Sequence, residues 1–455
     1  MTERPWLIIP IETKVRELDA KTYLACAAAE AGFRVLLGDQ NSLLRRLALL
    51  PRGFYLDKSV ARLKVKSFQR LEDLGFNILA WCEEGVVYRD RDAYLHERVA
   101  PTAFERVDAF FAWGRTQHDD MRLAVNDDAG KIHEVGNPRF DLLRPELREF
   151  YRPQAEALKA QHGDFILINT NFGRFNHFYG PTGVMKILRQ RGSIRDAKDE
   201  AFFKQWIEFL GKIYQGFREM VPALARAFPE RTIVLRPHPS EDHGNWRQLA
   251  EGLPNVKVIY EGGAIPWILA GAVSIHNSCT TGLEAALLDR PVIAYQPQKS
   301  EVYDSFLPNR VSVEAANAVE LIGRVRSALD GQLPAPLAVD ASVRDDVKRY
   351  VASMDGPQAT QRVVEQLLAL KDGAVLSRRR SPVIAVRDQG EQWARSLART
   401  ALAPLRPSQK YSRQKFPGLA CEEVETLVAN FRDLTGRFEN VRVLPGAKHF
   451  FIVTT

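Results

Sequence analysis

Residues Ser274–Glu284, SIHNSCTTGLE, are the stretch of the sequence that decides the fold. An apolar run, Ala272–Ile275, leads into a turn rich in serine and threonine, and a helical pattern, Gly282–Leu288, follows. At such a junction the unpaired N–H groups and the dipole of the helix favour an anion, and hydroxyl groups add donors. In an open parallel sheet the junction lies beyond the carboxyl end of a strand, where ligands bind. The stretch therefore predicts an α/β fold with a site for a nucleotide phosphate.

Within this stretch the hydroxyl side chains are the candidate phosphate ligands. Ser278, Thr280 and Thr281 stand at the start of the helix, where Ser and Thr also serve as plain N-caps. Three hydroxyls exceed what one cap requires, so we assign them to phosphate binding. Glu284 follows near the start of the same helix; it binds ribose hydroxyls if it faces a cleft and is only solvated if it faces outward.

A second strand end carries a constrained histidine. Leu235–Asp242, LRPHPSED, follows the apolar run Thr232–Leu235, and His238 stands between two prolines that restrict its backbone. Arg236 and His238 at this position can bind a phosphoryl oxygen. The alternative is a turn histidine whose ring is satisfied by the backbone.

Strand-length apolar runs alternate with helix-length segments along most of the chain, which is typical of doubly wound parallel sheets. We expect an α/β protein of two facing Rossmann-like domains with a helical C-terminal tail. Residues 1–145 would form the first domain and 146–373 the second, with a basic linker and helical tail in 374–455; Thr170–Arg195 is expected to be irregular. The expected strands are Trp6–Ile9, Phe33–Leu37, Phe54–Leu56, Phe76–Cys82, Ala109–Trp113 and Lys131–Val135, then Phe165–Asn169, Thr232–Leu235, Val256–Tyr260, Ala272–Ile275 and Val292–Tyr295.

Composition narrows the class of protein. The 455 residues are 45% apolar and 26% charged, as in ordinary globular proteins of two domains. The four cysteines form no CxxC pair, so we expect neither a zinc site nor disulfides, and a cytoplasmic location. No stretch has the roughly 20 apolar residues of a membrane helix. No GxGxxG follows the first strand, which disfavours a dinucleotide site, and no P-loop or GxSxG occurs.

A net charge of +7 permits acidic partners. We take the excess as diffuse and expect no nucleic acid, because no basic motif interleaved with aromatic residues occurs. Association with an anionic inner-membrane surface is a further hypothesis, based on this charge and on the SRRR segment at 377–380.

Paired carboxylates follow a strand in the first half of the chain. Glu83 and Glu84 precede a glycine in WCEEG, and adjacent carboxylates repel, so that one is held protonated or poised as a base. The alternative is an acidic loop or helix start. Other polar residues near strand ends or the break between the domains are candidates for the cleft and the acceptor, with a solvated loop as the alternative: Glu12, Lys14, Arg16, Glu17, Arg139 and Asn171.

The order Glu-Glu-Gly, His-Pro and Ser/Thr resembles the motif set of bacterial GT-B sialyltransferases, polysialyltransferases and Kdo transferases. The phrases PIETKVREL, WCEEG, GNPRFD, RPHPSE and TTGLEA, within residues 6–300, look most like the surface carbohydrate biosynthesis proteins. The resemblance implies a metal-independent GT-B glycosyltransferase with no cofactor and a CMP-linked acidic sugar as donor. One of Glu83 and Glu84 would be the general base, His238 would hold the donor phosphate, and Ser278, Thr280 and Thr281 would bind phosphate. The sialyltransferases often have an aspartate where this chain has Glu-Glu, which leaves the choice of base and the stereochemical outcome open.

Three hypotheses for function follow. The first is a glycosyltransferase that moves a sugar from a nucleotide donor to a surface polysaccharide or lipid-linked glycan. The second is a CDP-glycerol-type glycerophosphotransferase, which transfers a phosphodiester. The third is a non-catalytic GT-B-like scaffold, for which Glu83 and Glu84 would be dispensable.

Overall fold

A computed structural model describes residues 4–86, 89–125, 130–372, 381–401, 416–447 and 449–455. The chain forms two compact units, each assembled from separate segments. Unit 1 comprises Met1–Gly85, Arg98–Leu142 and Tyr350–Thr455, and unit 2 comprises Val86–Glu97 and Leu143–Arg349.

Unit 1 is built on an eight-stranded sheet with the order β13-β14-β2-β1-β3-β4-β5-β6. The six strands from β2 to β6 are parallel, and their residues are almost all buried, as the continuous apolar runs predict. Their bounds are β1 Trp6–Ile11, β2 Arg34–Asp39, β3 Gly53–Asp57, β4 Asn77–Ala80, β5 Ala109–Ala112 and β6 Ile132–Glu134.

The C-terminal residues complete this sheet. β13 (Arg442–Ala447) and β14 (Phe450–Thr454) form an antiparallel hairpin, and β14 pairs antiparallel with β2. Gly38 of β2 permits the pairing, because a Cβ there would lie 2.3 Å from the His449 carbonyl oxygen. The tail is therefore helical only in part. Its apolar end forms a strand of the sheet, which was not predicted from the sequence.

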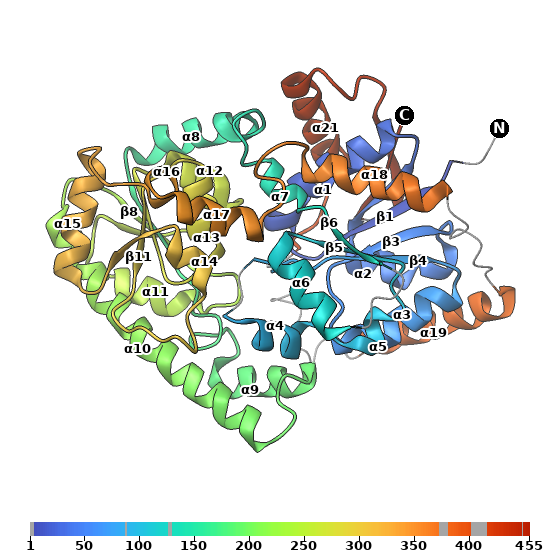
Figure 1. Cartoon of the computed structure of the whole chain (residues 1–455), viewed down its shortest axis with the longest axis horizontal. Coiled ribbons are helices and arrows are strands. Elements are labelled where there is room, and N and C mark those ends of the chain that lie inside the picture. Colours follow the sequence, from blue (N-terminus) through green and yellow to red (C-terminus); the bar gives the residue numbers. More distant parts are fainter. Residues whose placement is uncertain (1–3, 87–88, 126–129, 373–380, 402–415, 448) are drawn as a thin grey trace. The chain divides into compact units, whose positions relative to one another are not determined.

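Helices cover both faces of this sheet (Figure 1). α1, α7, α18 and α21 pack together on one face, and α2 and α3 lie on the other. The bounds are α1 Lys14–Glu30, α2 Gln40–Arg45, α3 Val65–Asp73, α5 Pro101–Phe104, α6 Arg115–Ala124, α7 Pro138–Asp141, α18 Ala359–Asp372, α19 Pro382–Ala401 and α21 Cys421–Thr435, with short 3-10 turns η1 Leu47–Leu49 and η2 Arg62–Lys64.

Unit 2 is built on a six-stranded, fully parallel sheet with the order β12-β11-β10-β7-β8-β9. Numbered within the unit, this is the 3-2-1-4-5-6 order of the Rossmann fold. The bounds are β7 Ile166–Asn169, β8 Ile233–Arg236, β9 Val256–Val258, β10 Val273–His276, β11 Val292–Tyr295 and β12 Val313–Ala315.

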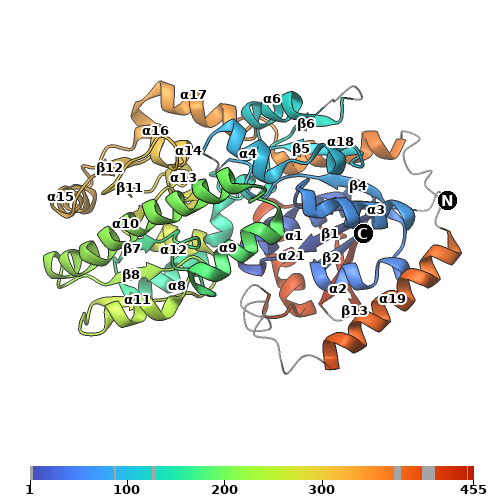
Figure 2. The ribbon, with the colours of Figure 1, turned by 90° about the horizontal axis from the view of Figure 1, so that it is seen from below.

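The helices of unit 2 also lie on both faces of its sheet (Figure 2). α10 packs on α15 at one face, and α8, α12 and α13 pack together at the other. The bounds are α4 Arg91–Arg98, η3 Arg148–Tyr151, α8 Arg152–His162, α9 Gly180–Arg191, α10 Ala197–Ala227, α11 His243–Ala250, α12 Ala264–Ala270, α13 Thr280–Leu287, α14 Phe306–Arg310, α15 Ala318–Leu329, α16 Pro336–Val339 and α17 Ala341–Tyr350.

The predicted fold class, an α/β protein with two Rossmann-like units, is confirmed. The expectation of an irregular Thr170–Arg195 is wrong for Gly180–Arg191, which form α9. The helix has a proline in its first turn and ends at Gly192 in the left-handed conformation, and both are common at helix boundaries. Its side chains Val184 and Leu188 pack against Phe203.

The expected linker at 374–388 is also helical in part, because α19 begins at Pro382. Residues 374–380 lie outside the described residues. No helix in the described part of the chain is long and apolar enough to cross a membrane.

Candidate functional site

In unit 2 two polar loops meet where the strand order reverses. The first strand of the unit, β7, pairs with β10, and the loops that follow them leave the same edge of the sheet. The backbone N–H of Asn171, after β7, donates a 2.9 Å hydrogen bond to Oδ1 of Asn277, after β10. The predicted Ser/Thr stretch thus lies at the position where ligands bind in such sheets.

Helix α13 starts at this junction. Its N-cap residue, Cys279, gives no side-chain hydrogen bond to the helix, so no side chain of the cap residue satisfies the first N–H groups. Ser278 adopts a left-handed conformation with φ of 45°, which few residues other than glycine accept. Its hydroxyl is bonded to the side-chain amide of Asn309 at 2.9 Å. Thr280 is half-buried at the first helical position.

His276, the histidine of the Ser274–Glu284 stretch, is a buried positioning residue. Its Nδ1 accepts from the Cys279 N–H at 3.3 Å, so Nε2 carries the ring proton and donates to the Ser312 hydroxyl at 2.9 Å. Burial lowers the pKa of His276 to about 3, so the ring is neutral. Its ring also packs on Gly282, where a Cβ would lie 2.3 Å from Nε2. His276 therefore fixes the loop from inside and does not face a ligand.

Glu241 joins the loops after β7 and β8 and was not singled out from the sequence. It is 1% exposed, and burial raises the pKa of its carboxyl, although the donated hydrogen bonds oppose this. All its hydrogen-bond partners are donors, which matches the ionised form: Thr170 Oγ1 at 2.7 Å, Phe172 N at 3.0 Å, His238 N at 3.1 Å, Asn176 Nδ2 at 3.3 Å and Trp246 Nε1 at 2.8 Å. One buried carboxylate therefore holds the backbone of the His238 loop.

The His238 ring is oriented by Ser240. The Ser240 N–H donates to His238 Nδ1 at 3.2 Å, and the Ser240 hydroxyl lies 2.7 Å from the same atom. Because Nδ1 accepts, the proton of the neutral ring is on Nε2, which makes Nε2 a donor. Gly173 allows this packing, since a Cβ there would lie 2.0 Å from the Ser240 hydroxyl oxygen.

Three predicted nucleotide-binding residues of unit 2 are more enclosed than expected. The Arg236 guanidinium is buried, donates to the carbonyl oxygens of Glu261 and Gly262 at 2.8 and 3.0 Å, and stacks on Trp267. Burial lowers the pKa of Arg236 to about 10. Glu284 is 5% exposed, which excludes the solvated alternative. The Thr281 hydroxyl oxygen is buried as well. Arg236 therefore holds the segment that contains Glu261 and Gly262.

In unit 1 the equivalent edge is occupied by charge pairs. The parallel strands reverse order between β1 and β3, and Glu12, after β1, forms an ion pair with Lys58, after β3. Lys58 was not predicted from the sequence.

Glu83 is held by a buried lysine. Lys21 of α1 lies 3.0 Å from Glu83 and 2.7 Å from Glu17, and its side chain is 5% exposed. Burial would raise the pKa of Glu83, but Lys21, Arg16 and Arg139 outweigh it and lower the pKa to about 2. Burial raises the pKa of Glu17, against the effect of Lys21, and the neighbouring Glu83 raises it further.

Glu84 is paired with two arginines, of which Arg16 also acts on Glu83. It forms ion pairs with Arg16, at 3.6 Å, and with Arg98, and its side chain is 41% exposed. The expectation that repulsion holds one of Glu83 and Glu84 protonated is wrong for Glu83, because nearby cations lower its pKa. That one of the two is poised as a base stays a prediction. Glu17 and Glu83 share the buried cation Lys21.

The other predicted cleft residues divide in the same way. Arg16 donates to the Glu83 carbonyl oxygen and so joins the charged group. Lys14 turns to the segment before and within α21, where it donates to the Gly418 carbonyl oxygen at 2.8 Å and to Glu423 at 2.6 Å. Arg139 follows the Asn137 cap of α7 and is near enough to Glu83 to lower its pKa.

The structure thus forms one group in each unit. We call Glu12, Arg16, Glu17, Lys21, Lys58, Glu83, Glu84 and Arg98 the charged group of unit 1, and Asn171, His238, Ser240, Asn277, Ser278 and Thr280 the donor group of unit 2. Among the described residues no three His, Cys, Asp or Glu side chains are placed to hold a metal ion.

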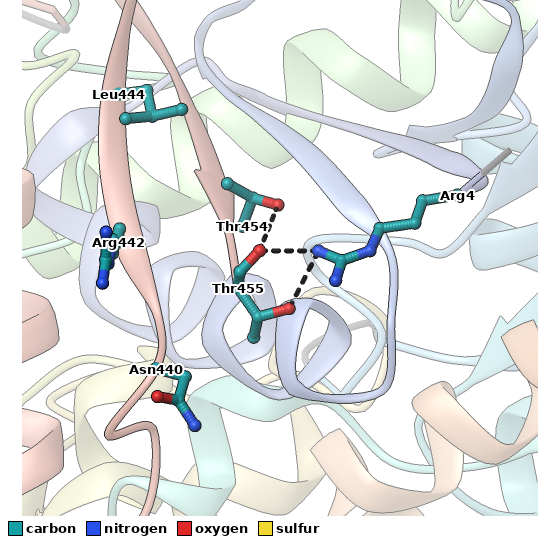
Figure 3. A pocket seen from close by; sticks show the side chains of 6 residues that line it. All are labelled: Arg4, Asn440, Arg442, Leu444, Thr454 and Thr455. Carbon is teal, nitrogen blue, oxygen red and sulfur yellow. Dashed lines mark hydrogen bonds between the residues drawn. The ribbon is translucent and has the colours of Figure 1, made fainter. Parts of the chain in front are cut away.

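An open hollow in unit 1 lies elsewhere (Figure 3). Arg4, which precedes β1, donates to the backbone oxygen and hydroxyl of Thr455 at 2.6 and 3.0 Å. The hollow is therefore at the amino-terminal end of β1, opposite to the edge that carries the charged group.

Comparison with known proteins shows the fold. No family model matches the sequence, and no curated protein sequence matches it. Among solved structures, the wall teichoic acid polymerase TagF superposes with a TM-score of 0.50 at 11% identity, over 80% of this chain and 88% of TagF. A Methanocaldococcus jannaschii UDP-GlcNAc 2-epimerase, solved with UDP-GlcNAc and UDP, has a TM-score of 0.49 at 14% identity, over 80% of this chain and 99% of its own. The fold class is thus α/β with the two Rossmann-like units of GT-B architecture.

Proposed function

We propose that the chain is a metal-independent glycosyltransferase that moves a sugar from a nucleotide donor to a surface polysaccharide or lipid-linked glycan. The donor we favour is a CMP-linked acidic sugar, such as Kdo or a sialic-acid-like sugar. The observation that carries the proposal is the donor group of unit 2, which lies at the strand reversal of a Rossmann-type sheet beside the start of α13.

The donor group is suited to a departing nucleotide. When the bond between the sugar and its phosphate breaks, the electron pair and negative charge move onto the phosphate. Thr280, Ser278 and the first N–H groups of α13 would receive this charge, and His238 would donate from Nε2. Neutral donors fixed in advance need no rearrangement at that moment.

The contacts within the charged group support different roles for Glu83 and Glu84. Glu83, with a pKa of about 2, stays ionised and paired, so we assign it a positioning role. We assign the general base to the half-exposed Glu84, which would take the proton of the acceptor hydroxyl as that oxygen bonds to the sugar.

The test separates binding from turnover. We expect His238→Ala to weaken CMP binding, measured by calorimetry, by about tenfold or more, while the matched His118→Ala variant in unit 1 binds as the parent does. Glu84→Gln should keep nucleotide binding and lower turnover by about 100-fold or more. Thermal unfolding of each variant controls for the fold. Unchanged CMP binding in His238→Ala would refute the donor site.

The likeness of the fold to TagF favours a second candidate, a glycerophosphotransferase that uses CDP-glycerol. In that reaction the acceptor oxygen bonds to phosphorus, and CMP leaves from CDP-glycerol. A panel of CMP-, CDP-, UDP- and GDP-linked donors, scored by the released nucleotide, decides between the two. Nucleotide binding without turnover of any donor would instead indicate a scaffold.

We further propose a cytoplasmic location. It is supported by the four cysteines, all of which are free and three of which are buried.

A further inference from the structure

Helix α19 turns an apolar stripe toward solvent. Val383 is 78% exposed, Val386 75% and Trp393 65%. At 3.6 residues per turn these three side chains share one side of the helix, and Gly390 lies between them. A helix on the surface of a globular protein normally buries such a stripe.

The opposite side of α19 is fixed to unit 1 by a polar contact. Asp388 is 9% exposed, and both of its carboxylate oxygens accept hydrogen bonds from Arg70 of α3, one of them at 2.8 Å. The helix also packs against η1 and runs along the outside of unit 1 (Figures 1 and 2). The ion pair therefore determines which side of α19 faces inward, and the apolar side is left facing out.

The positive charge of the sequence is concentrated in α19 and in the residues that precede and follow it along the chain. Residues 377–415 contain ten Lys or Arg against two Asp or Glu, a formal +8, whereas the whole chain carries +7, so all other residues together carry −1. The expectation of a diffuse excess is therefore wrong. Within the stretch, Arg387 and Arg395 belong to the described part of α19 and are exposed.

We propose that α19 is the docking surface of this protein for an anionic lipid bilayer. Val383, Val386 and Trp393 would enter the interface between headgroups and acyl chains, while Arg387 and Arg395 of the helix meet the lipid phosphates. Tryptophan suits this boundary, because its ring is apolar and its N–H polar. A second copy of the chain is a poorer partner, since two stretches of +8 would repel each other.

The first experiment uses the full chain and sedimentation with vesicles of phosphatidylcholine and 30% phosphatidylglycerol, against phosphatidylcholine alone. We expect binding to the anionic vesicles, weakened by salt. Replacing Val383, Val386 and Trp393 together by serine should lower the partition coefficient by about tenfold or more. The matched control is Val319→Ser with Val339→Ser in unit 2, where the valines are 82% and 71% exposed; it should bind within about twofold of the parent.

A second measurement locates the helix directly. Trp393 is the most exposed of the described tryptophans, so lipids brominated along the acyl chain should quench its fluorescence. Trp393→Phe should retain binding and lose most of this quenching.

Equal binding of the serine variant and the parent would overturn the proposal, as would quenching that persists in Trp393→Phe. If the parent does not bind vesicles but forms dimers, and the serine variant does not form them, the apolar stripe is the docking surface for a second copy of the chain. CMP binding by the same variants is expected to be unchanged, so failure here is distinguishable from failure of the donor site.

Discussion

The two units have similar sheets, but different interactions hold the loops at the carboxyl ends of their parallel strands. In unit 1 the loops after β1, β3 and β4 are held by ion pairs, with Lys21 buried between Glu17 and Glu83. In unit 2 the loops after β7 and β8 are held by neutral donors, which gather around the single carboxylate of Glu241. The loop after β10 is joined to the loop after β7 by the bond from the Asn171 N–H to Asn277. Carboxylates paired with cations stay ionised, whereas donors with few competing acceptors suit an arriving anion.

The largest effect should come from Glu241. Alanine in its place leaves five buried donors without their acceptor, so we expect a loss of about 3–5 kcal/mol in the free energy of unfolding, measured in urea. The exposed Glu208→Ala on α10 should change it by less than about 0.5 kcal/mol. If Glu241→Ala is as stable as Glu208→Ala, the network around this carboxylate does not hold unit 2 together.

Glu83 and Glu84 test the same idea in unit 1. Glu83→Gln should cost about 3 kcal/mol at neutral pH, because its carboxyl has a pKa of about 2 against 4.5 when unfolded. The contribution of Glu83 is complete above pH 4.5 and disappears as the pH falls toward 2. The difference between parent and variant should shrink over that range.

Glu84→Gln is the matched comparison in unit 1. It should cost less than about 1 kcal/mol, since its ion pairs are solvent-exposed. Equal losses for Glu83→Gln and Glu84→Gln would remove the distinction between the two carboxyl groups.

His276 gives unit 2 a sensitivity to acid. Its pKa is about 3 in the folded chain and 6.5 in the unfolded chain, so the unfolded state takes up the proton first. The contribution of His276 to the free energy of unfolding is fully present above pH 6.5. Below that pH the free energy should fall by about 1.4 kcal/mol per pH unit, which is about 2 kcal/mol at pH 5. In His276→Asn this part of the acid dependence should be absent, and parallel pH profiles for parent and variant would contradict the assignment.

Substitutions of Ser278 should change the free energy of unfolding only slightly, and glycine and alanine should change it in opposite directions. Glycine accepts a φ of 45° without strain, so Ser278→Gly should be neutral or up to about 1 kcal/mol more stable. Ser278→Ala keeps the strain, loses the bond to Asn309 and should be about 1 kcal/mol less stable. Both should weaken CMP binding; if affinity is unchanged, the hydroxyl is not a phosphate ligand.

The fold could be predicted because its signals are local. Buried parallel strands read as short apolar runs, and the prolines and hydroxyl residues around His238 and Ser278 mark the ends of β8 and β10. These patterns place residues at the correct edge of a sheet without knowledge of any distant contact.

The contacts that hold the sites could not be predicted, because their partners come from distant segments. Glu241 receives donors from the loop after β7, and Lys21 of α1 reaches Glu83 after β4. Nothing in the sequence around Glu241 or Lys21 specifies those partners. For the same reason the sequence predicted that Glu83 and Glu84 repel each other, although each is neutralised by residues from other segments of the chain.

The C-terminal hairpin has a consequence for biosynthesis. β2 emerges from the ribosome early, but its outer edge is covered only after β14 has been made, since Gly38 pairs with Phe450. Unit 2 lies between them in a nearly continuous segment and can complete its sheet first. During that interval β2 exposes an unpaired edge of apolar residues to other nascent chains. Unit 1 is therefore the last part of the protein to complete its sheet, although its first strand is made before any strand of unit 2.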